Sequence, residues 1–218
     1  MMRIYHAVRI VGGTLLATLL WLTACQDRSP AETQDTPRYP LPKMGPSDVS
    51  EAGDTSFYQV PPFGFVDQDS QLITDELVAD KVHVVDFFFV NCPTICPKMS
   101  QQMLRVHDAF LEEERVALLS HTIDPAHDTV AVLHAYAEAL AVESRRWHML
   151  TGNQDSLYNM ARAYMVPAQE DPEAPGGYIH SGAFILLDGE RRIRGFYDGT
   201  KPEEVDEMME DMRWLLAR

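Results

Sequence analysis

The sequence predicts an α/β domain in which a central mixed sheet is flanked by helices. Strand-like and helical segments alternate from about residue 57 to residue 218. The run from Val82 to Val90 is almost entirely β-branched and aromatic, which is typical of a parallel strand buried on both faces. A segment of about 160 residues also has the length of one domain.

The first elements of this domain are short. Phe57 to Val60 and Phe65 to Val66 have the composition of strands, and Asp67 to Ser70 has the composition of a turn. Thr74 is placed to cap a short helix that extends through Ala79. The buried strand of residues 82–90 follows, so these pieces are expected to lead the chain into the centre of the sheet.

The remaining elements continue the strand-helix order and close with a hairpin and a helix. The expected elements are a helix from Pro97 to about Glu114, a strand from Val116 to Ile123, a helix capped by Asp128 or Thr129 that runs to about Val142, a short extended segment from Trp147 to Leu150, a helix from Leu157 to Tyr164, a hairpin of Ile179 to Leu187 and Arg192 to Tyr197, and an amphipathic helix from Lys201 to Leu216.

The N-terminus predicts export and a lipid anchor. Arg3 and Arg9 accompany an apolar run that ends in Leu22-Thr23-Ala24-Cys25, a pattern typical of a lipoprotein signal peptide over residues 1–24. Cleavage before Cys25 leaves its thiol for lipidation. The alternative is an uncleaved membrane-spanning anchor, although the run is short for a span of about 20 residues. Both interpretations predict a cell-envelope protein that faces the periplasm, held in the inner or the outer membrane.

Residues 25–56 predict a flexible linker tethered at Cys25. The segment combines many small and polar residues with little apolar periodicity, and it contains five prolines: Pro30, Pro37, Pro40, Pro42 and Pro46. Residues 57–218 are then the folded domain, and the linker would allow this domain to move beside its membrane.

The formal net charge of the chain is -15. Nucleic acid and anionic lipid surfaces are poor partners for a protein of this charge, whereas a basic protein or a cation is a better one. The alternative is that the charge only keeps the domain soluble.

The chain contains three cysteines, and two of them form a C-x-x-x-C pair, Cys92 and Cys96. The pair follows the strongest strand, at the end of an α/β sheet where ligands and reactive groups collect. A helix that starts near Pro97 directs its positive end at both thiols and lowers their pKa values. Cys92 precedes this helix and is expected to be the more exposed nucleophile. Thiolates carry out disulfide exchange and also bind soft metals such as Cu(I) or Zn(II).

Other roles for the pair remain open at this stage. A passive disulfide is compatible with an oxidising compartment, although the loop that it would close is very short. The two residues could also be small buried apolar residues of the core. Met99 and Met103 continue the same helical stripe and are expected to fill the core.

Two thiolates are too few for a closed metal site, so a further ligand must come from another segment. Most of the eight histidines are expected to be structural or on the surface, as single histidines usually are. His180 differs because it begins a strand after a loop, residues 169–177, that is rich in Pro, Gly and acidic residues. Such a loop could carry an imidazole toward the thiols.

Four stretches together resemble the Sco/SenC family of membrane-tethered, thioredoxin-like copper proteins that assemble cytochrome c oxidase. They are Phe87 to Pro97, Asp124-Pro125-Ala126-His127-Asp128-Thr129, Leu150-Thr151-Gly152, and Tyr178 to Ser181 together with Leu186 to Gly189. The resemblance extends over most of residues 57–200. It implies a thioredoxin-like fold and copper ligands at Cys92, Cys96 and His180.

The resemblance also gives Asp124 a possible role beside the ligands, where it could orient the site. The alternative is that Asp124 and Asp128 only shape a turn and cap the next helix.

The function implied by the resemblance is a copper metallochaperone whose recipient is the Cu(A)-carrying subunit of a haem-copper oxidase. Two thiolates and an imidazole suit Cu(I), and leave room for a weak further ligand when Cu(II) binds. A second periplasmic copper chaperone is a candidate partner in addition to the membrane, whereas nucleic acid is not expected. The alternative is a thiol-disulfide reductase in which Cys92 and Cys96 are the catalytic redox pair. A sensor that signals through a partner is a third class.

Overall fold

The computed structural model describes residues 39–142 and 145–218, and none of the helices in these ranges has the length and apolar character needed to cross a membrane. The expected signal peptide, Cys25 and the linker residues up to 38 lie outside the described residues.

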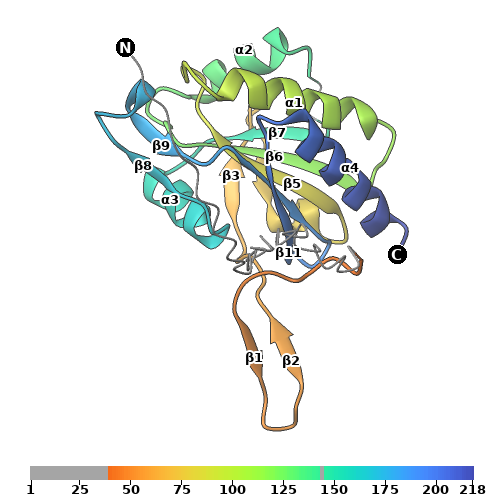
Figure 1. The fold of residues 1–218 in the computed structure, drawn as a ribbon. Coiled ribbons are helices and arrows are strands. Elements are labelled where there is room, and N and C mark those ends of the chain that lie inside the picture. The colour runs from red at the N-terminus through yellow and green to blue at the C-terminus, as the bar shows by residue number, and fades with distance from the viewer. Residues whose placement is uncertain (1–38, 143–144) are drawn as a thin grey trace, which may run out of the picture. The chain divides into compact units, whose positions relative to one another are not determined.

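A five-stranded sheet in the order β11-β10-β5-β6-β7 forms the centre of the domain (Figure 1). Its strands are β5 (Val82–Phe88), β6 (Val116–Thr122), β7 (Trp147–Leu150), β10 (Ala183–Leu187) and β11 (Ile193–Asp198). β5, β6 and β7 run parallel, whereas β10 is antiparallel to both β5 and β11. The sheet is therefore mixed, and the expected α/β class is confirmed.

Helices cover both faces of this sheet. They are α1 (Cys96–Ala109), α2 (Val130–Ala139), α3 (Gln154–Ala163) and α4 (Pro202–Leu216). α1, α2 and α4 lie over one face and α3 lies over the other (Figure 1). Successive residues of a strand point to opposite faces. Accordingly, Phe88 packs against Tyr136 of α2, and its neighbour Phe87 packs against Tyr164 beyond α3, each with ring centroids 5.8 Å apart.

Two helix starts differ in how they are capped. The Thr129 side chain accepts a hydrogen bond from the Val132 backbone N–H, so Thr129 rather than Asp128 caps α2. Thr74 precedes a 3-10 turn, η1 (Asp75–Val78), but its side chain makes no capping hydrogen bond, and the expected cap there is wrong. Met99 and Met103 are buried in the core, as expected.

The folded part of the chain begins before residue 57. Tyr39 stacks on Trp214 of α4 with ring centroids 4.8 Å apart, and the Arg194 side chain donates hydrogen bonds to the carbonyl groups of Leu41 and Pro42. Residues 39–56 were expected to lie in the flexible linker, but the structure packs the first of them on the domain. These contacts are spaced irregularly among prolines, so they leave no periodic signal in the sequence.

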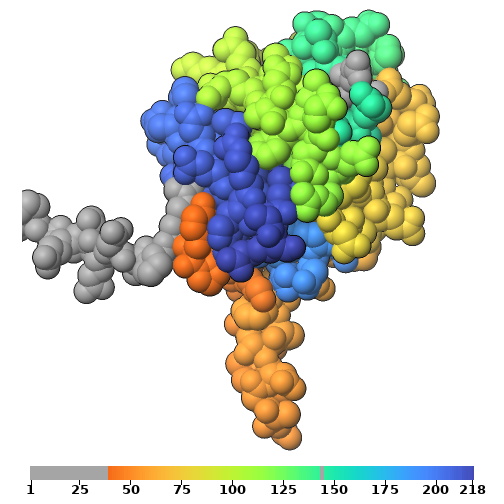
Figure 2. Space-filling model, turned by 90° about the vertical axis from the view of Figure 1, so that its right-hand side faces the viewer, coloured from red at the N-terminus to blue at the C-terminus, as the bar shows by residue number. Residues whose placement is uncertain are grey.

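The remainder of the expected linker forms a hairpin of β1 (Ser47–Val49) and β2 (Thr55–Phe57). All six strand residues are exposed, and Figure 2 shows the orange hairpin projecting from the body of the domain. The strand expected at Phe57 to Val60 is therefore displaced toward the N-terminus. Val60 is buried, and its backbone N–H donates to the Arg191 carbonyl.

Two further hairpins flank the central sheet. β3 (Gly64–Val66) pairs with β4 (Leu72–Thr74), and β8 (Ala168–Glu170) pairs with β9 (Tyr178–His180) across the 3-10 turn η2 (Pro175–Gly177). The single strand expected from Ile179 to Leu187 is thus two strands, β9 and β10. They separate because β9 pairs with β8, outside the central sheet, while β10 pairs with β5. This division places His180 at the end of a small hairpin.

Candidate metal centre

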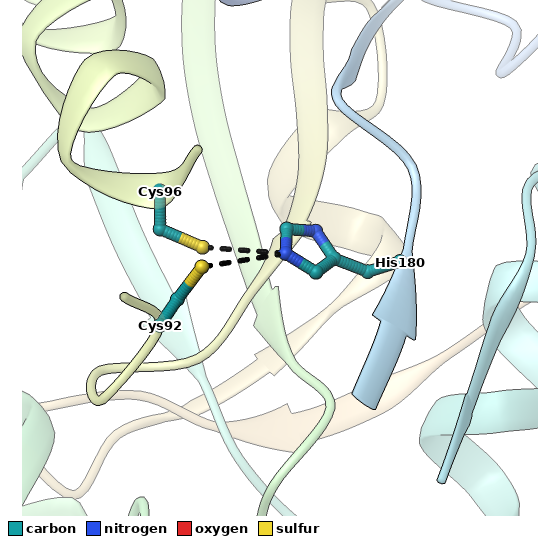
Figure 3. Close-up of side chains that lie close together, drawn as sticks. All are labelled: Cys92, Cys96 and His180. Atoms are coloured by element: carbon teal, nitrogen blue, oxygen red, sulfur yellow. Dashed lines mark hydrogen bonds between the residues drawn. The ribbon is translucent and has the colours of Figure 1, made fainter. Parts of the chain in front are cut away.

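Two thiols and one imidazole converge just beyond the carboxyl end of β5 (Figure 3). The Nε2 atom of His180 lies 3.7 Å from Sγ of Cys92 and 3.5 Å from Sγ of Cys96. Both cysteines are free thiols. One ligand atom from each of the three residues lies within 4.8 Å of the others. The structure therefore brings together the three residues expected as metal ligands.

The spacing of these atoms fits a bound soft metal ion. Metal–sulfur bonds of about 2.3 Å and metal–nitrogen bonds of about 2.0 Å, opened to the wide angles of a three- or four-coordinate ion, separate sulfur from nitrogen by about 3.5 to 3.7 Å. The two sulfur–nitrogen distances, 3.7 and 3.5 Å, lie in that range. Thiolates and an imidazole are also the donor set that copper ions prefer.

The strand-to-helix turn positions both thiols. The Cys92 backbone N–H donates to the Phe89 carbonyl just past β5, while Cys96 is the first residue of α1. Pro97 occupies the first turn of α1, where the absence of a backbone N–H has no cost. The two sulfur atoms thus sit at the positive end of the α1 dipole.

The two thiols ionise differently. Burial raises the pKa of Cys92, but hydrogen bonds from the Thr94 backbone and from Cys96 outweigh it and lower that pKa to about 6. Burial raises the pKa of Cys96 well above its ordinary value. Cys92 is 6% exposed and Cys96 is 2% exposed. Near neutral pH the pair therefore presents one thiolate, on the cysteine nearer to solvent.

The imidazole of His180 is oriented by its neighbours. Its edge packs on Phe89, with ring centroids 5.6 Å apart and an interplanar angle of 83°. Its Nδ1 atom lies 3.1 Å from the Ser181 carbonyl oxygen. A proton on Nδ1 donates to that oxygen and leaves the Nε2 lone pair directed at the thiols, as in metal-binding histidines generally.

The loop between β6 and α2 contacts both sides of the site. Asp128 is fully buried, and its Oδ2 atom accepts hydrogen bonds from the Val90 backbone N–H and from the Thr122 hydroxyl. Asp124 interacts with the Tyr178 side chain, which lies two residues before His180 on β9. Asp128 thus holds the loop that carries the cysteines, and Asp124 reaches the strand that carries the histidine.

Sequence reasoning assigned a supporting role to Asp124 but missed Asp128 and Tyr178. Asp128 was considered only as a turn former and helix cap. Tyr178 gave no signal in the sequence, since its contact with Asp124 depends on how the β8–β9 hairpin folds back.

The other described histidines make contacts away from the thiols. Nδ1 atoms of four of them lie within hydrogen-bond distance of carboxylates, in the pairs His107 with Asp108, His127 with Asp128, His134 with Asp69, and His148 with Asp67. Nδ1 of His83 faces the Lys81 carbonyl, and His121 lies among aromatic rings. Among the described histidines, His180 is therefore the one that faces the thiols, while His127 lies in a separate group with Asp124 and Asp128.

Fold and site together define a class. A mixed sheet flanked by helices, with a C-x-x-x-C pair at the strand-to-helix turn and a histidine delivered from a later strand, defines a thiol-and-imidazole protein of the thioredoxin-like type. The SCO1/SenC family model matches residues 52–217, which is most of the chain. The chain therefore belongs to the SCO1/SenC family.

Individual relatives agree with this membership. The SCO1 protein homolog of Bacillus subtilis is 28% identical over 158 residues, which cover 72% of this chain and 82% of that protein. The crystal structure of a SCO1/SenC family lipoprotein from Bacillus anthracis superposes with a TM-score of 0.67 at 25% identity, covering 73% of this chain and 95% of the other.

Two further structures carry functional descriptions. BsSco, described as a member of the Sco family of cytochrome c oxidase assembly proteins with a disulfide switch, is 28% identical with a TM-score of 0.62, covering 72% of this chain and 92% of the other. Yeast Sco1 with copper bound is 26% identical with a TM-score of 0.57, covering 72% of this chain and 89% of the other. The expected thioredoxin-like fold is confirmed by these neighbours.

Proposed function

We propose that this protein is a membrane-tethered copper metallochaperone of the cell envelope that delivers copper to the Cu(A) centre of a haem-copper oxidase. The observation that carries the proposal is the convergence of Cys92, Cys96 and His180, whose donor atoms have the spacing and the softness that copper requires. Copper bound to yeast Sco1 and the oxidase-assembly role ascribed to BsSco support the same assignment.

The site is built for transfer as well as binding. Three protein ligands leave a coordination position that a recipient's thiol can enter, so copper can pass by ligand exchange. Beside the site lies an apolar groove of about 450 Å³, lined by residues that include Ile95, Ser181 and Phe196. In the sequence, Ile95 lies between the two cysteines and Ser181 follows His180, so a partner in the groove would contact the segments that carry the three ligands.

The anchor forms part of the proposal. Cys25 is the proposed lipidation site, in the frame Leu22-Thr23-Ala24-Cys25, and the Bacillus anthracis relative is described as a lipoprotein. The mature protein should begin at Cys25 with a mass increased by acyl chains, measured on the membrane-extracted protein. An unmodified N-terminus at another residue would rule out the lipid anchor, and an intact Met1 would indicate a membrane-spanning one.

One observation favours a second function. Free thiols with unequal pKa values, lower at Cys92 and higher at Cys96, are suited to an attacking and a resolving cysteine. The alternative is therefore a thiol-disulfide reductase that keeps client cysteines reduced for metallation. Its chemistry needs both cysteines, whereas copper delivery also needs the imidazole of His180.

A comparison of three strains separates the two functions. In a copper chaperone, His180→Ala should lower oxidase activity as much as deletion does, and added copper should partly restore it by mass action. Cys92→Ala serves as the matched loss of a thiol. A healthy oxidase in the His180→Ala strain beside a defective one in the Cys92→Ala strain would instead establish the reductase, as would rescue of the deletion by a reductant better than by copper.

A further inference from the structure

Asp86 is a buried acid that forms no ion pair with a described Lys or Arg. Its side chain lies in β5 and is 3% exposed. Within residues 39–142 and 145–218, no Lys or Arg forms an ion pair with it. Buried carboxylates are normally paired with a cation or bound to a metal, because an isolated buried charge is costly. The ionised form of Asp86 is therefore sensitive to any further charge placed near it.

A directed chain of hydrogen bonds fixes this carboxyl group. Nε1 of Trp147 in β7 donates to the Ser120 hydroxyl in β6 over 2.8 Å, and that hydroxyl donates to Oδ1 of Asp86 over 2.5 Å. Ser120 and Trp147 are buried as well. The chain crosses three adjacent parallel strands and ends on the carboxylate, so it stabilises the ionised form of Asp86.

The charge of Asp86 reaches the thiol-and-imidazole site. Asp86 points to the same face of β5 as Phe88, which packs on Tyr136 of α2. The Tyr136 hydroxyl lies 2.7 Å from that of Ser100, one turn after Cys96 on α1. The charge of Asp86 therefore acts on Cys96 and Tyr136 above this face, and on His180. Two of the three proposed copper ligands therefore lie within the field of one buried carboxylate.

We propose that Asp86 sets the valence preference of the bound copper, favouring Cu(II) while it is ionised and losing that preference when it is protonated. Two thiolates and Cu(I) carry a net charge of -1, whereas two thiolates and Cu(II) are neutral. A neighbouring negative charge therefore disfavours the reduced site relative to the oxidised one. The inference rests on the proposed copper site, in which the neutral oxidised state adds no repulsion to the charge of Asp86.

Protonation makes the preference depend on pH. Burial raises the pKa of Asp86 to about 6, while the hydrogen bond from Ser120 opposes that rise. Below this pH the carboxyl becomes neutral, and the copper reduction potential should rise. Reduction adds one electron to the copper and one proton to Asp86 only in the pH range where the carboxyl is ionised beside Cu(II) and protonated beside Cu(I). Below that range Asp86 already carries its proton, and reduction adds an electron alone.

The test compares the Cu(II)/Cu(I) potentials of the full domain in an equilibrium titration with a chemical reductant. Asp86→Asn keeps an acceptor for Ser120 and removes the charge. It should increase the preference for Cu(I) about tenfold at pH 7.5, which is 59 mV for a one-electron couple. Its potential should also lose most of the pH dependence of the wild type. Asp211→Asn, which removes a buried carboxyl on α4, is the matched control and should leave the potential unchanged.

Each contrary result has a distinct meaning. Equal potentials in the wild type and Asp86→Asn would overturn this inference and leave the copper site standing. Equal shifts in Asp86→Asn and Asp211→Asn would overturn it too, because the effect would then be a general one of buried charge. A wild-type protein that binds no copper would overturn the proposed function and the inference together.

A second measurement needs neither copper nor the Asp86→Asn variant, so it still tests the proposal if that variant fails to fold. Trp147 reports on the carboxyl through Ser120, so its fluorescence in the metal-free protein should change near pH 6. A Trp214→Phe background isolates the signal of Trp147 in the domain. Ser120→Ala removes the bond that favours ionised Asp86, so it should shift the pH step of the copper potential upward. An unshifted step in Ser120→Ala would contradict the proposal.

Discussion

His180 and His121 both pack against aromatic rings, but only His180 is placed to bind a metal ion. His180 packs its edge on Phe89, and His121 stacks on Phe87 with ring centroids 5.1 Å apart. Phe87 lies in β5 and Phe89 lies just beyond its end, so both histidines pack on rings near the carboxyl end of this strand. The difference lies in what faces their nitrogen atoms.

The nitrogen atoms of His180 face two thiols and a carbonyl oxygen, whereas those of His121 have no hydrogen-bond partner in the part of the chain that the structure describes. Phe63, Phe65 and Tyr164 complete the surroundings of His121, and burial lowers its pKa to about 3. His121 is therefore a neutral aromatic component of the core. Ring packing alone does not distinguish a ligand from a core residue, but the partners of the nitrogen atoms do.

The largest expected effect is on copper affinity. His180→Ala, Cys92→Ala or Cys96→Ala should each weaken Cu(I) binding by about 100- to 1000-fold, since a ligand contributes roughly a quarter of the 10–16 kcal/mol found for four-ligand sites. His121→Phe should bind like the wild type. Competition with a chromophoric Cu(I) chelator, using fully reduced proteins, measures all four variants. Wild-type affinity in His180→Ala would remove the distinction between the two histidines.

The second effect is on the free energy of unfolding. Here His121 should matter more than His180, which is the opposite of the expected effect on copper binding. His121→Ala leaves a cavity among fully packed aromatic rings and should lower the free energy of unfolding by about 3 kcal/mol. His180→Ala should change it by less than about 1 kcal/mol in the metal-free protein, because its ring is only partly buried. Urea unfolding followed by circular dichroism gives both values. A larger loss in His180→Ala would mean that the metal site also holds the fold together.

The third effect is the response of stability to acid. Burial lowers the pKa of His121 to about 3. Between pH 6.5 and pH 3, His121 is therefore protonated in the unfolded state but not in the folded state. Stability is therefore lost as pH falls, by about 2 kcal/mol between pH 7 and pH 5. Buried His83, whose pKa is lowered to about 4, acts in the same direction.

Asp86 opposes these histidines over part of that range. Its pKa is raised to about 6, so the folded state binds its proton first and gains stability as pH falls from about 6 toward 3.8. The histidine contribution is isolated by comparing the wild type with His121→Phe in urea unfolding at pH 7 and pH 5. The variant should lose about 2 kcal/mol less than the wild type. Equal losses would mean that His121 accepts a proton in the folded state.

The positions of the two thiols could be predicted because they depend on residues that are close together in the sequence. Cys92 and Cys96 follow a strand that is clear from its apolar run. The short turn between this strand and the next helix restricts the positions that both thiols can take. His180 was a weaker candidate by spacing alone, and its assignment depended on the family resemblance. Its approach to the thiols requires β9 to leave the central sheet and pair with β8, which is a tertiary event with no local signature.

The fold shows the same division. The parallel strands and the four helices were predictable from their periodicity, whereas the ends of the elements and the small hairpins were not. Residues 39–46 illustrate the reason. Tyr39 finds its place by stacking on Trp214, a residue of the last helix, so nothing in the neighbouring sequence indicates the contact. The ends of these elements and the small hairpins depend on contacts between segments that are distant in the sequence. In a single sequence such contacts leave only scattered apolar residues.

The smallest expected effect tests whether the orientation of His180 matters beyond its presence. Burial and the contact with Asp124 raise the pKa of Tyr178, so its hydroxyl stays protonated and can donate to that carboxylate. Tyr178 also packs on Phe89, which contacts His180 as well. Tyr178→Phe removes the hydroxyl and keeps the ring. Loss of one hydrogen bond, about 1 kcal/mol, should then weaken copper binding about fivefold.

A purely structural role of Tyr178 would lower stability without changing the metal environment, so the Cu(II) absorption and paramagnetic resonance spectra provide the decisive measurement. Asp124→Asn, which leaves an oxygen able to accept a hydrogen bond from the tyrosine hydroxyl, should restore part of the wild-type spectrum relative to Asp124→Ala. Identical spectra in the wild type, Tyr178→Phe and Asp124→Ala would show that β9 holds His180 without this link. His180 would then differ from His121 only in having the two thiols beside its nitrogen atom, because no further group would be needed to orient its imidazole.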